Sequence, residues 1–184
     1  MNKLYFATTN KGKLKEASEI LGCEVVGTPL EIEEIQSLDL DIVAVQKAKD
    51  YYQQIKKPLF VEDGSMEFSA LNGLPGTYIN DFLKALGNKG LVELLKGKKD
   101  RRAKAMVEVV YIPKKGKVYK FVGSVKGTIA KRPMGKKGFG WDAIFIPDGQ
   151  IRTFGQMNLE EKNKYSMRDK ALKKFKRWLQ ENNQ

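Results

Sequence analysis

The chain alternates between short apolar segments that are typical of strands and longer segments whose apolar residues recur at helical spacing. Residues 3–8 and 23–27 have the apolar character of buried strands, and a helix is expected between them over about 11–21. Apolar side chains recur at helical spacing over 40–55, and a further apolar strand is expected over 58–61. The later segments continue the alternation, with helices near 79–86 and 89–96, long strands over 103–112 and 117–130, and a last helix that opens at Ser166. This order predicts an α/β fold with a mixed sheet.

Length and cysteine content limit the class of protein. The 184 residues are enough for one domain with a sizeable core, and no linker or internal repeat divides 1–184. The sequence contains no run of about 18 apolar residues, so no membrane span is expected, and its N-terminus lacks the apolar segment of a signal peptide. Cys23 is the only cysteine, which excludes an internal disulfide. We therefore expect a single-domain cytoplasmic protein.

The net charge of +12 favours a polyanionic partner. Nucleotides and nucleic acids both fit this charge, and a lysine-rich surface also serves solubility. The chain contains no histidine, which excludes histidine-based acid–base catalysis, a Ser-His-Asp triad and histidine-ligated zinc. Any hydrolysis must therefore depend on carboxylates and on a hard cation that prefers oxygen ligands.

The segment 8–13, Thr-Thr-Asn-Lys-Gly-Lys, lies where the first strand gives way to the first helix. The N–H groups in the first turn of a helix lack intrahelical partners and favour phosphate. Thr8 and Asn10 add neutral polar groups, and Lys13 adds a full charge one turn into the helix. The glycine spacing differs from that of a Walker loop. Asn10 also suits a purely structural N-cap, so both interpretations stay open.

Glu62 and Asp63 follow directly on a predicted strand. Neighbouring side chains on a strand point to opposite faces, but Gly64 allows a bend that would bring both carboxylates to one side. Together with a third acid, such a pair is able to hold Mg²⁺ and to orient a water for in-line attack. The alternative is an ordinary solvent-exposed acidic turn.

The segment 138–142, Gly-Phe-Gly-Trp-Asp, carries groups suited to a nucleotide base. Glycines flank the aromatic rings of Phe139 and Trp141, which are able to stack on a purine, and Asp142 is able to accept a hydrogen bond from a base or sugar. Aromatic residues at the start of a strand also fit a core position. Both interpretations of this segment stay open.

The segment 160–168 leads into the last helix. Ser166 and Arg168 stand at the beginning of that helix, where anions and carbonyl groups are favoured. Taken alone, the segment is also typical of an ordinary capped surface helix.

Together, and in this order, the four segments resemble the Ham1/inosine-triphosphatase family of pyrophosphatases, over about residues 4–172. The family patterns are T-x-N-x-x-K, an acidic pair before L-G-G-x-P-G, G-F-G-[YW]-D and E-K-N-x-x-S-H-R. Here they stand at 8–13, at Glu62 and Asp63 before 71–76, at 138–142 and at 161–168. The Glu-Asp pair and Trp141 are closer to the eukaryotic and archaeal branches of the family than to the bacterial one.

The resemblance implies a fold, an activity and an assembly. The fold is an elongated, twisted mixed sheet whose flanking helices form two lobes around a central cleft. The activity is hydrolysis of ITP, dITP and XTP to the monophosphate and pyrophosphate, with Mg²⁺ as the cofactor and Mn²⁺ as a substitute. A homodimer is expected, because family members are commonly homodimers and two-fold dimers are the commonest oligomers. Purine nucleoside triphosphates are the expected partners, rather than membranes or nucleic acid.

The resemblance also assigns roles by position. It implies that the triphosphate is held by Thr8, Asn10, Lys13 and Lys47. The metal ligands would be Glu34, Glu62 and Asp63, of which Glu62 and Asp63 are also the catalytic pair, with Asp63 as the base or water-orienting group. The nucleotide base would be framed by Phe139, Trp141 and Asp142, and its oxygens read by Lys162, Ser166 and Arg168.

Two departures from the family pattern carry weight. Met167 stands where the family has the histidine of S-H-R, and Gln156 stands where a glutamate precedes Met157. We expect base selectivity to be relaxed or shifted, while hydrolysis is retained. Two other functions stay open: a pyrophosphatase of the related Maf type that acts on modified nucleotides, and a non-catalytic binder of nucleotides or nucleic acid.

Overall fold

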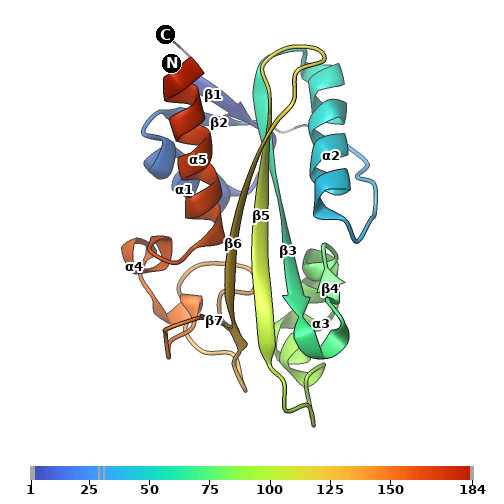
Figure 1. Ribbon diagram of the computed structural model, residues 1–184, viewed down its shortest axis with the longest axis vertical. Helices are drawn as coiled ribbons and strands as arrows, with labels where there is room; N and C mark the ends of the chain where they lie inside the picture. The colour runs from blue at the N-terminus through green and yellow to red at the C-terminus, as the bar shows by residue number, and fades with distance from the viewer. Residues whose placement is uncertain (1–2, 29, 31, 183–184) are drawn as a thin grey trace. The chain divides into compact units, whose positions relative to one another are not determined.

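The computed structural model describes residues 3–28, 30 and 32–182 (Figure 1). The strands are β1 (Lys3–Phe6), β2 (Glu24–Gly27), β3 (Leu59–Phe68), β4 (Pro75–Gly76), β5 (Arg102–Ile112), β6 (Tyr119–Ile129) and β7 (Phe145–Pro147). The helices are α1 (Lys11–Leu21), α2 (Leu40–Ile55), α3 (Ile79–Glu93), α4 (Leu159–Asn163) and α5 (Met167–Asn182), with short 3₁₀ turns η1 (Ser69–Leu71) and η2 (Phe154–Gln156). Within these described ranges, no helix has both the length and the apolar character needed to cross a membrane.

The strands form one seven-stranded mixed sheet. Its order is β2-β1-β3-β5-β6-β7, and β4 pairs with β3 outside this path. β1 is parallel to both β2 and β3, whereas β4 is antiparallel to β3 and β7 is antiparallel to β6. The α/β fold with a mixed sheet and flanking helices that the sequence predicted is confirmed.

The chain divides into two compact units that alternate along the sequence. Unit 1 comprises Met1–Asp63, Val107–Gly123 and Arg168–Gln184, and unit 2 comprises Gly64–Met106 and Ser124–Met167. The strands β3, β5 and β6 contribute residues to both units. The expectation that 1–184 forms a single domain stays a prediction.

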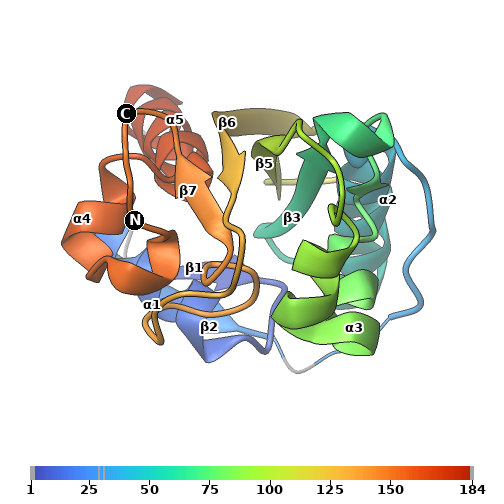
Figure 2. The same ribbon diagram turned by 90° about the horizontal axis from the view of Figure 1, so that it is seen from below.

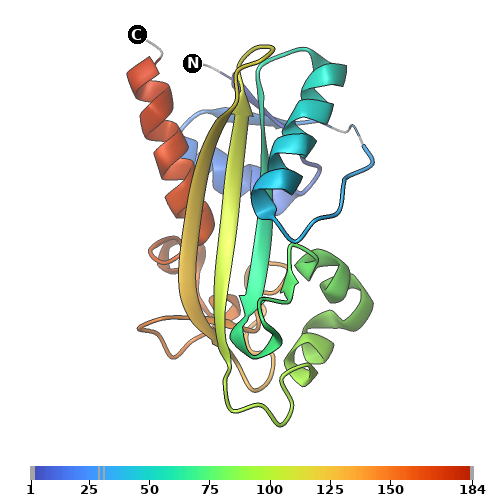
Figure 3. The same cartoon turned by 45° about the vertical axis from the view of Figure 1, so that its right-hand side comes forward.

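The core of unit 1 lies on both faces of its strands, because successive residues of a strand point in opposite directions. On one face, Leu59 and Val61 of β3 pack against α2. On the other face, the ring of Phe60 stacks on Phe6 with centroids 4.3 Å apart and meets Phe175 of α5 at 5.3 Å. Figure 3 shows α2 and α5 on either side of these strands.

The helices α1 and α2 begin and end where the sequence predicted. Each has an N-cap side chain that accepts hydrogen bonds from the first turn: Asn10 caps α1 and Asp39 caps α2. Gly22 ends α1 in the left-handed conformation, with φ of 71°, which glycine adopts without strain.

β3 extends further than the sequence predicted. The expected strand covered 58–61 and was followed by a bend at Gly64, but β3 runs from Leu59 to Phe68. Its second half pairs with β4, where Met66 lies opposite Gly76. Strand pairing thus continues past Glu62 and Asp63, so both acids lie inside a strand. The expected bend that would bring both carboxylates to one side is wrong, and so is the alternative of a solvent-exposed acidic turn.

Unit 2 contains a helix with a break. The two helical stretches expected near 79–86 and 89–96 belong to one element, α3, in which Gly87 is non-helical with φ of 63° and ψ of 178°. Only glycine adopts this backbone conformation readily. Figure 2 shows α3 from below.

Candidate active site

Asn10 shapes the junction between β1 and α1. Its Oδ1 accepts hydrogen bonds from the N–H groups of Gly12 (2.9 Å) and Lys13 (3.2 Å), and its own N–H donates to Thr8 Oγ1 (3.2 Å). Asn10 is exposed and Thr8 is half-buried. The N-cap interpretation of Asn10 is therefore confirmed. A phosphate-binding role for Thr8, Asn10 and Lys13 stays a prediction with which this exposed turn is compatible.

Glu62 and Asp63 point to opposite faces of β3, as the strand alternation requires. Glu62 shares the face of Phe60, where it contacts Lys13 of α1 and Arg168 of α5. Asp63 lies on the other face, where it contacts Lys47 of α2. Two neighbouring carboxylates thus enter two different clusters of charged side chains.

The first cluster, the Glu62 cluster, consists of Glu62, Arg168, Lys13 and Glu16. Arg168 donates from Nε to Glu62 Oε2 at 2.7 Å and from Nη2 to Glu62 Oε1 at 2.8 Å. Its third nitrogen, Nη1, donates to Glu16, and Lys13 Nζ lies 3.2 Å from Glu62 Oε1. Two carboxylates and two cations thus balance in charge, which makes the burial of Glu62, Glu16 and Arg168 tolerable.

The same contacts set the protonation of Glu62. Burial alone raises the pKa of this carboxyl, but the charges of Arg168 and then Lys13 outweigh burial and bring the pKa to about 2. For Arg168, burial alone lowers the pKa, and the charges of Glu62 and Glu16 outweigh it and raise the pKa further above its ordinary value. Glu62 and Arg168 are therefore both ionised at neutral pH.

The second cluster, the Asp63 cluster, consists of Asp63, Lys47 and Glu34. Lys47 Nζ lies 2.7 Å from Glu34 Oε1 and 3.4 Å from Asp63 Oδ2. Burial lowers the pKa of Lys47, but Asp63 and Glu34 together outweigh burial and raise it. The side chain of Glu34 is 35% exposed, whereas that of Asp63 is 12% exposed. The more exposed carboxylate makes the shorter contact with Lys47.

Of the three carboxylates predicted to bind Mg²⁺, only two lie near one another. Oxygen ligands are those that Mg²⁺ prefers, and Glu34 and Asp63 already converge on one positive charge, that of Lys47. Glu62 instead faces Arg168, and the described residues contain no group of three or more His, Cys, Asp or Glu side chains arranged around one metal position. Mg²⁺ is often held by one or two carboxylates together with substrate phosphates. The donor set fits that mode rather than a closed cage of protein ligands.

In unit 2, Asp142 and Lys162 form a buried ion pair with a separation of 2.9 Å between Oδ2 and Nζ. Both residues are 3% exposed. The Lys162 ammonium lies 4.8 Å from the ring centroid of Phe139 and 5.9 Å from that of Phe154, so two aromatic faces add to the stabilisation of its charge. The structure thus brings together three of the residues predicted to contact the base.

Asp142 also organises the 138–142 loop. Its Oδ2 accepts a hydrogen bond from the Phe139 N–H at 2.9 Å. Gly138 has φ of 74°, and a Cβ at this position would lie 2.1 Å from Asp142 Oδ2, so only glycine fits. Phe139 and Trp141 are half-buried, and Trp141 packs edge-on against Phe145 with centroids 5.8 Å apart. The core interpretation therefore holds in part for Trp141.

Comparison with known proteins places the chain in a family. Its sequence matches the Ham1 family over residues 4–178. The chain belongs to the Ham1 family. It is 40% identical over 183 residues to the dITP/XTP pyrophosphatase of Methanopyrus kandleri, with 98% of this chain and 97% of that protein covered. It is 42% identical over 180 residues to the inosine triphosphate pyrophosphatase of Yarrowia lipolytica, with coverage of 96% and 95%.

The fold is similarly shared with solved Ham1 structures. A HAM1 protein from Coxiella burnetii matches with a TM-score of 0.86 and 28% identity, covering 98% of this chain and 100% of that chain. The Ham1 protein of Staphylococcus aureus matches with a TM-score of 0.84 and 26% identity, covering 98% and 99%.

Ser166 and Arg168, which the Ham1 pattern assigns to the base, have other contacts in the structure. Ser166 is fully buried, and its N–H donates to the Lys162 carbonyl at 2.9 Å. Arg168 belongs to unit 1, where each of its three side-chain nitrogens donates to a carboxylate of the Glu62 cluster. The structure therefore shows an anchoring role for Arg168, and its reading of the base stays a prediction.

The two departures from the Ham1 pattern have structural consequences. Met167 is 3% exposed, so an apolar side chain fills a buried position where the family pattern has a histidine. Gln156 completes a capping box at η2, because its Oε1 accepts a hydrogen bond from the Thr153 N–H at 3.0 Å. A glutamate would be able to accept the same hydrogen bond, so the glutamine conserves this function.

Glu16 is a residue of the site that reasoning from the sequence missed. A glutamate in a helix rich in charged residues is usually solvated, and only its position three residues after Lys13 places it on the same helix face. Its burial at 4% exposure follows from Arg168, which is 152 residues away in the sequence. That distance in sequence is why no local pattern revealed it.

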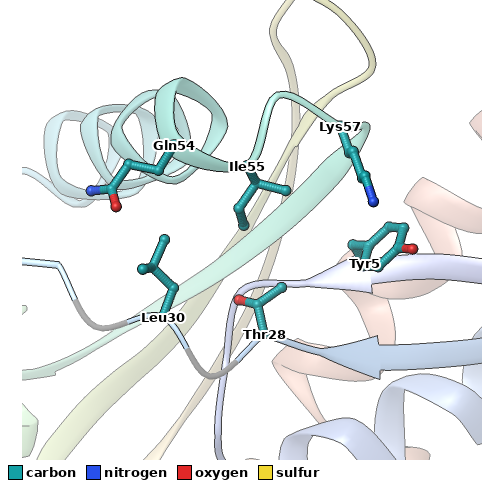
Figure 4. A pocket seen from close by; sticks show the side chains of 6 residues that line it. All are labelled: Tyr5, Thr28, Leu30, Gln54, Ile55 and Lys57. Carbon is teal, nitrogen blue, oxygen red and sulfur yellow. The ribbon is translucent and has the colours of Figure 1, made fainter.

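A pocket of about 480 Å³ lies elsewhere in unit 1 (Figure 4). It is lined by Tyr5, Thr28, Leu30, Gln54, Ile55 and Lys57, and by none of the residues that the Ham1 pattern assigns to the site. Lys57 Nζ lies 5.6 Å from the ring centroid of Tyr5. Thr28 Oγ1 is buried and has no hydrogen-bond partner within the described part of the chain.

Proposed function

We propose that this protein hydrolyses non-canonical purine nucleoside triphosphates, namely ITP, dITP and XTP, to the monophosphate and pyrophosphate. Relatives about 40% identical over nearly the whole chain are named dITP/XTP pyrophosphatase and inosine triphosphate pyrophosphatase. Within the structure, the proposal rests on one observation above all. Lysines from two helices meet neighbouring carboxylates of β3, Lys13 with Glu62 and Lys47 with Asp63.

Unit 1 is assigned the triphosphate. Lys13 lies in the first turn of α1, where the helix dipole and the N–H groups favour negative charge, and Asn10 holds this turn in shape. Lys47 supplies a second cation on the other face of β3. A triphosphate is highly charged and offers these lysines stronger partners than single carboxylates.

Asp63 is assigned as the group that orients the attacking water and accepts its proton. Its 3.4 Å contact with Lys47 is longer than the 2.7 Å contact between Lys47 and Glu34, so Glu34 is the closer partner of this lysine. The water oxygen forms a bond to the α-phosphorus, and the bond from that phosphorus to the α–β bridging oxygen breaks. Pyrophosphate leaves with the bridging oxygen and the electron pair. Glu62, held by Arg168, fixes the strand beside Asp63.

Mg²⁺ is the cofactor of this proposal, with Mn²⁺ as a substitute. Glu34 and Asp63 would hold the ion together with the phosphates, and the ion would neutralise charge on the triphosphate. Glu62, the third ligand that the family pattern implies, has both oxygens bound to Arg168 and does not fit this ion as well. The absence of histidine from the sequence is consistent with a cation bound by oxygen ligands alone.

Unit 2 is assigned the base. Phe139 and Trp141 offer aromatic faces, and the Lys162 ammonium beside Asp142 offers a hydrogen-bond donor. Hypoxanthine and xanthine carry a 6-oxo group that accepts a hydrogen bond, whereas adenine presents a donor at this position. Adenine would direct its 6-amino donor at the positively charged Lys162 ammonium, and a mismatch of this kind in a site built to donate hydrogen bonds is able to reach about 10⁴-fold in selectivity.

Assembly and location complete the proposal. We expect a homodimer, because two-fold dimers are the commonest protein oligomers. Light scattering would then give twice the 20.9 kDa of one chain. A cytoplasmic location is consistent with a single cysteine.

Identification of the products tests the reaction. Incubation of ITP with the protein and Mg²⁺, followed by chromatography, should give equal amounts of IMP and pyrophosphate. Asp63→Asn should lower the rate by about 10²-fold or more, the usual contribution of a positioned general base, while the exposed control Asp148→Asn should match the wild type. IDP and orthophosphate as products, or equal rates in the two variants, would contradict the proposed chemistry.

A further inference from the structure

The turn of the 138–142 loop has a support that lies outside the loop and outside the family motifs. The carbonyl of Gly140 accepts a hydrogen bond from Asn88 Nδ2 at 3.0 Å. Asn88 belongs to α3 and lies 52 residues earlier in the chain. Both residues lie in unit 2.

The Asp142 end of the loop and its middle are held in different ways. At the Asp142 end, Oδ2 accepts hydrogen bonds from the Phe139 N–H and from Lys162, and the Asp142 carbonyl accepts from the Gly155 N–H at 2.7 Å. The middle of the loop is formed by Gly140, which has φ of 63° and, because glycine lacks a Cβ, is not restricted to this conformation by its own side chain. An external hydrogen bond has most effect on the backbone at such a position.

The break in α3 accompanies this contact. Gly87 departs from helical geometry, and Asn88 is the residue directly after it. Leu83, in the part of α3 before the break, lies near Gly140 as well, since a Cβ built on Gly140 would be 3.9 Å from Leu83 Cδ2. Both parts of α3 therefore lie against the same glycine of the loop.

We infer that Asn88 is a positioning residue for base recognition: its hydrogen bond to the Gly140 carbonyl fixes the turn that carries Phe139 and Trp141. This inference rests on the proposed function for its effect on selectivity, but the hydrogen bond acts on the loop whatever the ligand is. Loss of the bond leaves Lys162 and Asp142 in place and loosens the rings that flank Gly140. Rings that are less well placed hold the base less firmly against the Lys162 ammonium, which weakens the hydrogen bond that distinguishes hypoxanthine from adenine.

Asn88→Asp tests the inference with almost no change in side-chain shape. The carboxylate cannot donate and repels the Gly140 carbonyl, so the hydrogen bond is replaced by a repulsive contact. Asn80→Asp is the matched control, because it makes the same chemical change at an exposed position of α3. The ratio of kcat/KM for ITP to that for ATP should fall about tenfold in Asn88→Asp and stay unchanged in Asn80→Asp.

Amide hydrogen exchange provides a reading that does not depend on turnover. The N–H groups of Phe139 and Asp142 are both hydrogen-bonded within the loop, so they report its opening. Their exchange should be about tenfold faster in Asn88→Asp than in Asn80→Asp, even if the protein hydrolyses no triphosphate. Unchanged exchange would overturn the positioning role. Faster exchange with an unchanged ITP-to-ATP ratio would overturn the link to base selection, whereas a wild type without turnover would overturn only the proposed function.

Discussion

At the scale of single residues, Arg168 is the side chain on which the buried charges of unit 1 depend. Its guanidinium is the donor to both Glu62 and Glu16, and all three residues are almost fully buried. A planar group with several fixed donors matches two carboxylates better than an ammonium would. Geometry of this kind is typical of a residue that holds a site in place.

Removal of Arg168 should therefore destabilise the protein strongly. Arg168→Met leaves two buried carboxylates with a single lysine, and we expect a loss of about 3–5 kcal/mol in the free energy of unfolding. The control Arg177→Met changes an exposed position of the same helix and should stay within about 0.5 kcal/mol of the wild type. Urea denaturation of both variants gives the comparison, and a loss below 1 kcal/mol in Arg168→Met would show that the carboxylates do not need the guanidinium.

Glu62 should make stability depend on pH in acid. Its pKa is about 2 in the folded protein against an ordinary value of 4.5, so between these values the unfolded chain binds more protons than the folded one. The stabilisation is complete above pH 4.5 and is lost as the pH falls towards 2. Glu62→Gln should therefore cost much more stability at pH 6 than at pH 3. An equal cost at both pH values, from urea denaturation, would mean that the charge of Glu62 contributes nothing.

At the scale of secondary-structure elements, local signals predicted the helices better than the strands. The bounds of α1 and α2 followed from their regular apolar faces, and Asn10 was also recognisable as the N-cap of α1. The second half of β3 had no such signal. Its polar residues and Gly64 are typical of a turn, and only pairing with β4 keeps them in a strand. Pairing partners are tertiary information, which a local pattern does not contain.

The first turn of α1 allows its two roles to be tested separately. Aspartate caps a helix as well as asparagine does, so Asn10→Asp should keep the stability of the wild type, whereas Asn10→Ala should lose about 1 kcal/mol. The added negative charge of Asn10→Asp should weaken triphosphate binding and raise KM for ITP about tenfold or more, because it opposes the charge of the phosphates. Thermal unfolding and steady-state kinetics measure the two effects. If KM for ITP rises in the destabilised Asn10→Ala but not in the negatively charged Asn10→Asp, this turn does not bind the phosphates.

At the scale of the whole molecule, some of the residues that the motifs grouped together meet in the fold and others do not. Asp142 and Lys162, 20 residues apart, come together as the motifs suggested. Arg168 instead joins Glu62, 106 residues away, although its motif lies beside Lys162 in the sequence. The difference arises because α5 and β3, which are far apart in the sequence, become neighbours only when the chain folds. The net charge of +12, known from composition alone, is consistent with anionic substrates but identified none of them.

The proposed enzyme is a pyrophosphatase that selects its substrate by the base. The most direct test is pyrophosphate release, with Mg²⁺, from ITP, XTP, dITP, GTP, ATP, CTP and dTTP, expressed as kcat/KM. ITP, dITP and XTP should exceed ATP by about 10²-fold or more, because the 6-amino group of adenine would direct a donor at the Lys162 ammonium, where the 6-oxo group accepts a hydrogen bond. Equal values for ITP and ATP, or no release from any triphosphate by the folded protein, would contradict it.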